Sequence, residues 1–300
     1  MAVMQAHPLR RRAEVSLVCV TFIWGATFVV VKEALADCST LLFLALRFSL
    51  AAAALAVVFR PLPSRDGKTK RMLAGGALAG VFLFSGYLLQ TLGLRSTSPS
   101  KSAFITGLCV VMVPVMAAIA ARRLPDRSVA LGIAAATVGM ALLTLRGASL
   151  RMERGDLLTL GGTIGFSVHI LVLGRLAPRL SFRGLALGQI STAALLALAS
   201  FWWVERTAVH WTPRLLGALV VTGLLATAAA FSIQSWAQRY TTTTRTALIL
   251  AMEPVFAWLV SFVVAGELLS PRAALGAVLI LCGILVVELK PLDRAVSPAL

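Results

Sequence analysis

The chain has 300 residues, of which 59% are hydrophobic and 13% charged, and its mean hydropathy is +0.90. Soluble domains carry about 25% charged residues, so this composition excludes a water-soluble fold, a disordered chain and a secreted disulfide scaffold. The formal net charge of +16 would suit either a nucleic acid or a membrane surface. The positions of the 28 Lys and Arg residues decide between these partners.

Apolar stretches recur ten times along the chain, most of them with the roughly 18 to 23 residues that a helix needs to cross a bilayer. The sequence therefore predicts an all-α polytopic membrane protein with ten transmembrane helices. The expected spans are 14–36, 41–59, 72–92, 102–121, 128–145, 157–176, 185–204, 215–237, 246–265 and 273–288. We interpret the first span as a retained helix, because its apolar run is longer than that of a signal peptide.

Basic residues indicate the orientation in the membrane. With a cytoplasmic N-terminus, 18 of the Lys and Arg residues fall in inner segments and 9 in outer segments. The positive-inside rule then places the short tails 1–13 and 290–300 in the cytoplasm and the protein in the inner (cytoplasmic) membrane. Because the basic charge is dispersed over six inner segments, we expect it to contact the lipid bilayer, and we expect no nucleic-acid partner.

The sequence contains an internal repeat. A shift of 144 residues aligns Gln90 with Gln234 and Lys101 with Arg245. The same shift pairs Arg95 with Arg239, Thr97 with Thr241, Ala103 with Ala247 and Gly139 with Gly283, and a weaker match at a shift of 142 pairs Arg47 with Gln189. The two halves of the chain are therefore expected to be copies of one unit.

Each repeat unit is expected to hold five helices, over residues 14–147 and 155–289. An odd number of helices means that the second unit enters the membrane the opposite way up. Inverted repeats give inward-open and outward-open states of similar energy, with a binding site near the midplane, as alternating access requires. The duplication therefore predicts a secondary transporter.

Short motifs along both halves also resemble a known family. They are Trp24-Gly-Ala-Thr-Phe28, Arg47-Phe48, Ser102-Ala103 with Pro114, Gly155-Asp156-Leu157, Glu253-Pro254-Val255, Gly266-Glu267 and Gly276 to Gly283. In this order they resemble the EamA type of the drug/metabolite transporter superfamily, over roughly residues 14 to 289. The resemblance implies two five-helix EamA units, a central substrate cavity and transport of small metabolites, often as export. It does not fix a substrate.

Four residues predicted within the membrane are candidates for the substrate cavity or for coupling: Trp24, Phe28, His169 and Glu253. An indole N–H away from the membrane interface needs an acceptor, and Phe28 shares the face of Trp24. A carboxylate in the hydrocarbon core must face the bundle interior, so Glu253 is either a binding or proton-coupling group or a neutral acid bonded to backbone. His169 is either a substrate or proton contact or a satisfied buried histidine.

Two further pairs are candidates for gates. Tyr87 and Gln90 share one helix face, and the repeat relates them to Phe231 and Gln234. The inversion places the first pair toward the outside and the second toward the inside. The alternative interpretation is that these are ordinary polar residues near helix ends.

Two prolines and one arginine inside the expected helices also stand out. Pro114 and Pro254 each remove a backbone donor and free the carbonyl of the residue four positions earlier, at Val110 and Leu250. Such helix breaks either kink the helix or offer carbonyls to a cavity. Arg47 is a buried charge that needs a carboxylate, a carbonyl, water or a substrate anion as partner.

The remaining chemistry-bearing residues predict no metal site and no cofactor. The four cysteines, Cys19, Cys38, Cys109 and Cys282, have no metal-binding spacing, and no P-loop is present. We therefore expect a transporter of a small-molecule substrate, such as an amino acid, sugar, nucleoside or drug-like compound, working as an exporter. A coupling proton and a homodimer are left open. The alternatives are a membrane receptor or structural protein, or an intramembrane enzyme, for which no catalytic set of residues is found.

Overall fold

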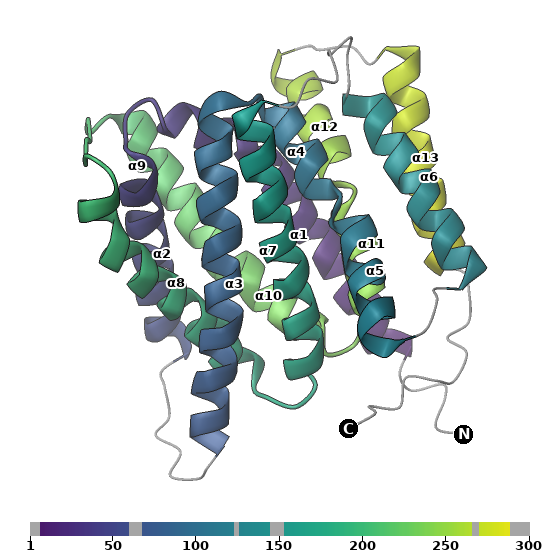
Figure 1. The fold of residues 1–300 in the computed structure, drawn as a ribbon, viewed down its shortest axis with the longest axis horizontal. Helices are drawn as coiled ribbons and strands as arrows, with labels where there is room; N and C mark the ends of the chain where they lie inside the picture. The colour runs from purple at the N-terminus through teal and green to yellow at the C-terminus, as the bar shows by residue number, and fades with distance from the viewer. Residues whose placement is uncertain (1–6, 60–67, 123–125, 145–152, 266–269, 289–300) are drawn as a thin grey trace.

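The computed structural model describes residues 7–59, 68–122, 126–144, 153–265 and 270–288. These residues fold into ten helical crossing segments, some of them interrupted (Figure 1). Eight of the segments are long and apolar enough to cross a membrane, and two are shorter apolar helices. The predicted all-α fold with ten helices is confirmed.

The two units have matching sets of helices. The first holds α1 (His7–Ala34), α2 (Thr40–Phe59), α3 (Lys68–Ser96), α4 (Pro99–Gly107) with α5 (Cys109–Ala121), and α6 (Arg127–Thr144). The second holds α7 (Arg154–Leu176), α8 (Phe182–Val204), α9 (Pro213–Val220) with η1 (Val221–Ala229) and α10 (Ala230–Ala237), α11 (Thr243–Leu250) with α12 (Glu253–Ala265), and α13 (Pro271–Glu288). Helix α1 begins at His7, so residues 7–13, expected as part of a tail, are helical. The Gly266-Glu267 motif and residues 290–300 lie outside the described ranges.

One crossing segment in each unit is broken near its middle. The first breaks at Leu108, between α4 and α5, and the second at Ala251 and Met252, between α11 and α12. The shift of 144 residues relates Leu108 to Met252, so the break belongs to the repeat. Pro114 lies inside α5, after the first break. Pro254 is the second residue of α12, a position where the missing N–H costs no helical hydrogen bond.

The eighth crossing segment contains a π-helix that the sequence did not predict. Segment η1 runs for nine residues between α9 and α10. Within it the Thr227 hydroxyl donates to the carbonyl of Thr222, five residues earlier, at 2.7 Å. A π-helix is wider than an α-helix and is rare outside functional sites. This segment packs against α2 and α1 of the first unit.

Charged side chains connect neighbouring segments at the end of the bundle where α1 ends. The ammonium of Lys32 donates to the carbonyls of Leu94, Arg95 and Thr97 at 2.5, 3.1 and 3.2 Å, and so caps the end of α3. The Asp37 carboxylate pairs with the Arg214 guanidinium of α9 at 2.9 Å. The first contact joins α1 to the end of α3 within the first unit, and the second joins the first unit to α9 of the second.

Glycines let the helices of the two units approach closely. A Cβ atom on Gly76 of α3 would lie 2.9 Å from the Cα atom of Gly188 on α8. At the edge of the bundle α6 and α13 lie side by side (Figure 1), and a Cβ on Gly283 would lie 2.6 Å from the carbonyl oxygen of Gly132. The hydrophobic effect does not drive helices together in lipid. Small residues at such crossings instead allow close van der Waals packing between the helices.

We expect Gly76→Leu to destabilise the protein by about 1 to 3 kcal/mol or more, because the new side chain must push α3 away from α8. The measurement is thermal unfolding of the purified protein in detergent. Gly217→Leu is the matched control, since a Cβ there meets no atom within 4 Å. Equal losses of stability in the two variants would contradict this packing argument.

Candidate functional site

A cavity with about 80 Å³ of free volume lies between the two units. It is lined from α1, α2, α3, α4 and α5 of the first unit and from α7, α10, α11 and α12 of the second. The lining includes nine residues that the sequence analysis singled out: Trp24, Phe28, Arg47, Tyr87, Gln90, His169, Phe231, Gln234 and Glu253. Pro114 and Pro254 are not among the described lining residues. The candidates for cavity, coupling, gate and buried charge therefore share one site.

Aromatic rings form one wall of this cavity. The Phe231 ring lies 5.2 Å from Trp24, 6.0 Å from Tyr87 and 5.7 Å from the His169 ring, measured between centroids. Tyr87 in turn lies edge-on to Phe166 at 5.1 Å. Edge-to-face packing is the geometry that aromatic quadrupoles favour. Tyr87 and Phe231, which the repeat relates to each other, are thus in contact across the boundary between the units.

Arg47 is buried and its hydrogen-bond partners are neutral. Its Nε donates to the Thr227 hydroxyl at 2.7 Å, one Nη donates to the Tyr87 hydroxyl at 3.3 Å, and the guanidinium lies 4.5 Å from the centre of the Tyr87 ring. Among the described residues no carboxylate forms an ion pair with Arg47. The cavity therefore contains a positive charge that is hydrogen-bonded but not neutralised by an ion pair.

The π-helix provides the acceptors that hold two of the cavity side chains. Besides the contact from Thr227 to Arg47, the indole Nε1 of Trp24 donates to the backbone carbonyl of Ala226 at 2.8 Å. Both acceptors belong to η1, whose wide turns change the directions of its backbone groups. The π-helix thus positions a cation and an indole from the first unit.

His169 is held from behind by two residues of the second unit. Its Nε2 lies 2.6 Å from Oε1 of Gln189, and the Gln189 amide nitrogen donates to the Ser235 hydroxyl at 2.9 Å. With the amide oriented in this way, Nε2 of His169 is the donor and Nδ1 of the neutral ring is left as an acceptor. Gln189 occupies the place in α8 that Arg47 occupies in α2, according to the shift of 142 residues.

Glu253 is a buried carboxylate at the start of α12 and lines the cavity. The partial positive charge of the helix N-terminus favours an acid there. The described part of the chain supplies no cation within ion-pairing distance of its carboxylate. Its backbone carbonyl lies where a Cβ on Gly25 would approach to 2.6 Å, so only a glycine lets α1 pack against this break.

Gln90 and Gln234, which the repeat relates to each other, differ in their hydrogen bonds. Gln90 donates through Nε2 to the Thr106 hydroxyl at 2.8 Å. In the second unit Leu250 stands at the position that the repeat relates to Thr106, and Oε1 of the buried Gln234 has no partner within the described residues. Gln234 therefore presents an unsatisfied acceptor at the cavity.

Several residues of the site were not found from the sequence. Thr227 accepts a hydrogen bond from Arg47, and Gln189 contacts the His169 ring. Thr106 and Phe166 line the cavity directly. Threonine, glutamine and phenylalanine are common in membrane helices, so their residue types gave no signal. The weak match of Gln189 with Arg47 was the one indication available.

Ten crossing segments in two inverted units, with a cavity lined by both, are typical of membrane transporters of the inverted-repeat class. The profile of the EamA-like transporter family matches residues 11–145 and again residues 153–289. The chain belongs to this family, so the resemblance noted in the sequence is confirmed.

Relatives with similar sequences are also described as transporters. An uncharacterized transporter of Archaeoglobus fulgidus is 33% identical over 282 residues, which cover 94% of this chain and 87% of the relative. The uncharacterized transporter YoaV of Bacillus subtilis is 22% identical over 277 residues, covering 89% and 94%. A solved crystal structure superposes with a TM-score of 0.76 at 17% identity, over 93% of this chain and 97% of the other, which is a likeness of fold.

We expect Thr227→Val to lower the free energy of unfolding by about 1 to 3 kcal/mol, because it leaves the buried Nε of Arg47 without its acceptor. The measurement is denaturant unfolding in detergent micelles. Thr137→Val is the control, since that hydroxyl bonds the carbonyl of Ile133 within its own helix. A loss no larger than that of the control would show that this contact does not stabilise the fold.

Proposed function

We propose that the protein is a secondary transporter that moves a small metabolite across the cytoplasmic membrane by alternating access. The observation that carries this proposal is a cavity lined by residues of both units. Two related units around one site supply the two facing states of similar energy that alternating access needs. Export is the direction that the sequence motifs imply, and the distribution of basic residues supports cytoplasmic termini.

The chemistry of the cavity favours a zwitterionic substrate with an apolar or aromatic body, such as an amino acid. Arg47 offers a cation to a substrate carboxylate, and Glu253 offers an anion to a substrate ammonium. The ring cluster around Phe231 packs against the body, and Oε1 of Gln234 accepts an N–H.

Tyr87 with Gln90 and Phe231 with Gln234 serve, in this proposal, as the two sides of the site that close over the substrate in turn. Their shared position at the boundary of the units supports this role, because any relative motion of the units changes the contact of 6.0 Å between the Tyr87 and Phe231 rings. Substitution of one pair should bias the transporter toward one facing state, and substitution of the other pair toward the opposite state.

We expect Arg47→Gln to weaken binding of a carboxylate-bearing substrate by about 10- to 100-fold, the value of one charge-assisted hydrogen bond. The purified protein in liposomes is tested by counterflow with amino acids, their methyl esters, nucleosides and sugars. Arg183→Gln is the control, because Arg183 stacks on Phe59 and Phe182 away from the cavity. Saturable flux of uncharged sugars alone would contradict the proposed substrate, and no saturable flux at all would contradict the transporter proposal.

We expect Glu253→Gln to remove part of the pH dependence of counterflow, because glutamine keeps the shape of the side chain but cannot exchange a proton. The experiment compares flux at two pH values on each side of the liposome membrane for the parent protein and the variant. An unchanged pH profile would show that Glu253 has no coupling role.

A further inference from the structure

Two of the ion pairs that cross the boundary between the units involve the broken helices. The Lys101 ammonium of α4 lies 2.9 Å from Oδ2 of Asp156 on α7, and we call this contact the Asp156 pair. The Arg245 guanidinium of α11 lies 3.2 Å from Oε1 of Glu14 on α1, and we call this contact the Glu14 pair. Each pair joins the broken helix of one unit to the first helix of the other.

The repeat relates the two pairs to each other. The shift of 144 residues that relates their basic members also relates Thr97 to Thr241. Thr97 donates its hydroxyl proton to Asp156 at 2.6 Å, and Thr241 donates to Glu14 at 3.3 Å. Both acids lie in the N-terminal part of the first helix of their unit, Glu14 in α1 and Asp156 in α7. An acid, a base and a threonine therefore recur with the same connectivity, which independent surface ion pairs would not produce.

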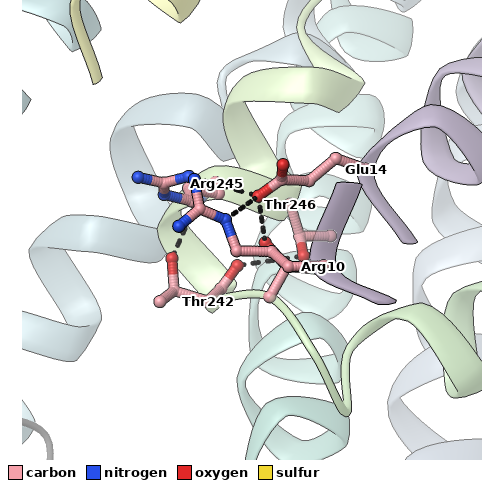
Figure 2. A network of polar contacts seen from close by, with 6 residues as sticks. Arg10, Glu14, Thr242, Arg245 and Thr246 are labelled. Carbon is pink, nitrogen blue, oxygen red and sulfur yellow. Dashed lines mark hydrogen bonds and ion pairs between the residues drawn. The ribbon is translucent and has the colours of Figure 1, made fainter. Parts of the chain in front are cut away.

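The two pairs lie at opposite ends of the helix bundle. Glu14 is near the start of α1 and Asp156 is in the first turn of α7, and these two helices cross the bundle in opposite directions because five crossings separate them. In Figure 1, α4 lies at the upper end of the bundle and α11 below the middle. Figure 2 shows the Glu14 carboxylate in contact with both Arg10 and Arg245.

Short half-helices connect these pairs to the cavity. Helix α4 has nine residues and ends just before the break at Leu108. Lys101 lies in its first turn, and the cavity-lining Thr106 lies in its last turn. Helix α11 has eight residues, with Arg245 in its first turn and the cavity-lining Leu250 at its end. If the cavity end of α4 or α11 moves, the basic residue at the other end of that half-helix moves with it.

Each pair contains one charged side chain that is buried in this structure. The Asp156 side chain is 3% exposed and that of Arg245 is 4% exposed. A buried charge that loses its partner keeps its desolvation penalty unless water reaches it. The units can therefore separate at either pair only when water enters that face of the protein, which is what opening of that face means.

We propose that the Asp156 pair and the Glu14 pair are the closing contacts of the two gates of the transport path, one at each face of the membrane. This assignment rests on the proposed alternating-access function. Opening toward one face breaks the pair at that face and keeps the other. With the cytoplasmic termini expected from the sequence, the Glu14 pair closes the cytoplasmic side and the Asp156 pair closes the opposite side.

The test uses a native thiol as the reporter of access. Cys109 lines the cavity, and replacing Cys19, Cys38 and Cys282 by alanine leaves it as the single cysteine. A charged, membrane-impermeant methanethiosulfonate is added to one side or the other of proteoliposomes in which the protein is oriented. The labelling rate of Cys109 from each side reports which face is open.

We expect Asp156→Asn and Lys101→Gln each to raise labelling from the Asp156 face roughly tenfold relative to the other face. Glu14→Gln should do the same from the opposite face. If one member of the Asp156 pair does not fold when substituted, the other carries the test. Lys101→Asp combined with Asp156→Lys should restore the parental ratio. The control is Asp37→Asn, which breaks the pair with the half-exposed Arg214 but touches no broken helix, and should leave the ratio unchanged.

Increased labelling from the same face in both sets of variants, or an unchanged ratio in both, would overturn the gate assignment. Counterflow by the parent protein separates this outcome from a failure of the proposed function. Opposite changes of labelling without saturable flux would contradict transport and keep the two closing contacts. Saturable flux with an unchanged labelling ratio would contradict the closing contacts alone.

Discussion

The hydrogen bonds of the backbone are the constraint on which this structure depends, because the hydrocarbon core of a bilayer offers no water to a free N–H or C=O. Irregular backbone is tolerated there only where it is buried in protein or lines a cavity. Residues on both sides of each break line the cavity, and the π-helix η1 accepts hydrogen bonds from the lining residues Trp24 and Arg47. The irregular segments and the polar side chains of the site thus occupy the same place for one physical reason.

The sequence predicted the crossing segments and much of the cavity lining, because polar groups cannot face the hydrocarbon core. Arg47, His169 and Glu253 are conspicuous because polar side chains inside apolar helices must face the protein interior. The residues that hold them, Thr227 and Gln189, gave no comparable signal, since a hydroxyl or amide can also bond within its own helix. The position of the break escaped prediction too. A proline indicates where a helix can break, but the break lies at Leu108, where the cavity is.

Duplication supplied the symmetry of the molecule, and later divergence supplied the chemistry of its site. The acid, base and threonine sets at the two ends remain alike, as do the broken helices. Near the cavity the copies differ, since Gln90 is satisfied by Thr106 whereas its counterpart Gln234 is not satisfied. The repeat is thus kept in the ion-paired sets and the helix breaks, and is partly lost among the residues that line the cavity.

The π-helix makes the length of its segment as important as its residues. Because a π-helix fits more residues into each turn than an α-helix does, deleting one residue from η1 would let the segment close into ordinary α-helix with the residues after it in nearly unchanged orientation. The carbonyl of Ala226 and the hydroxyl of Thr227, which accept from Trp24 and Arg47, would then change direction. Selection on this gene should therefore act against single-codon deletions in η1, even though every backbone hydrogen bond of the shortened helix could still form.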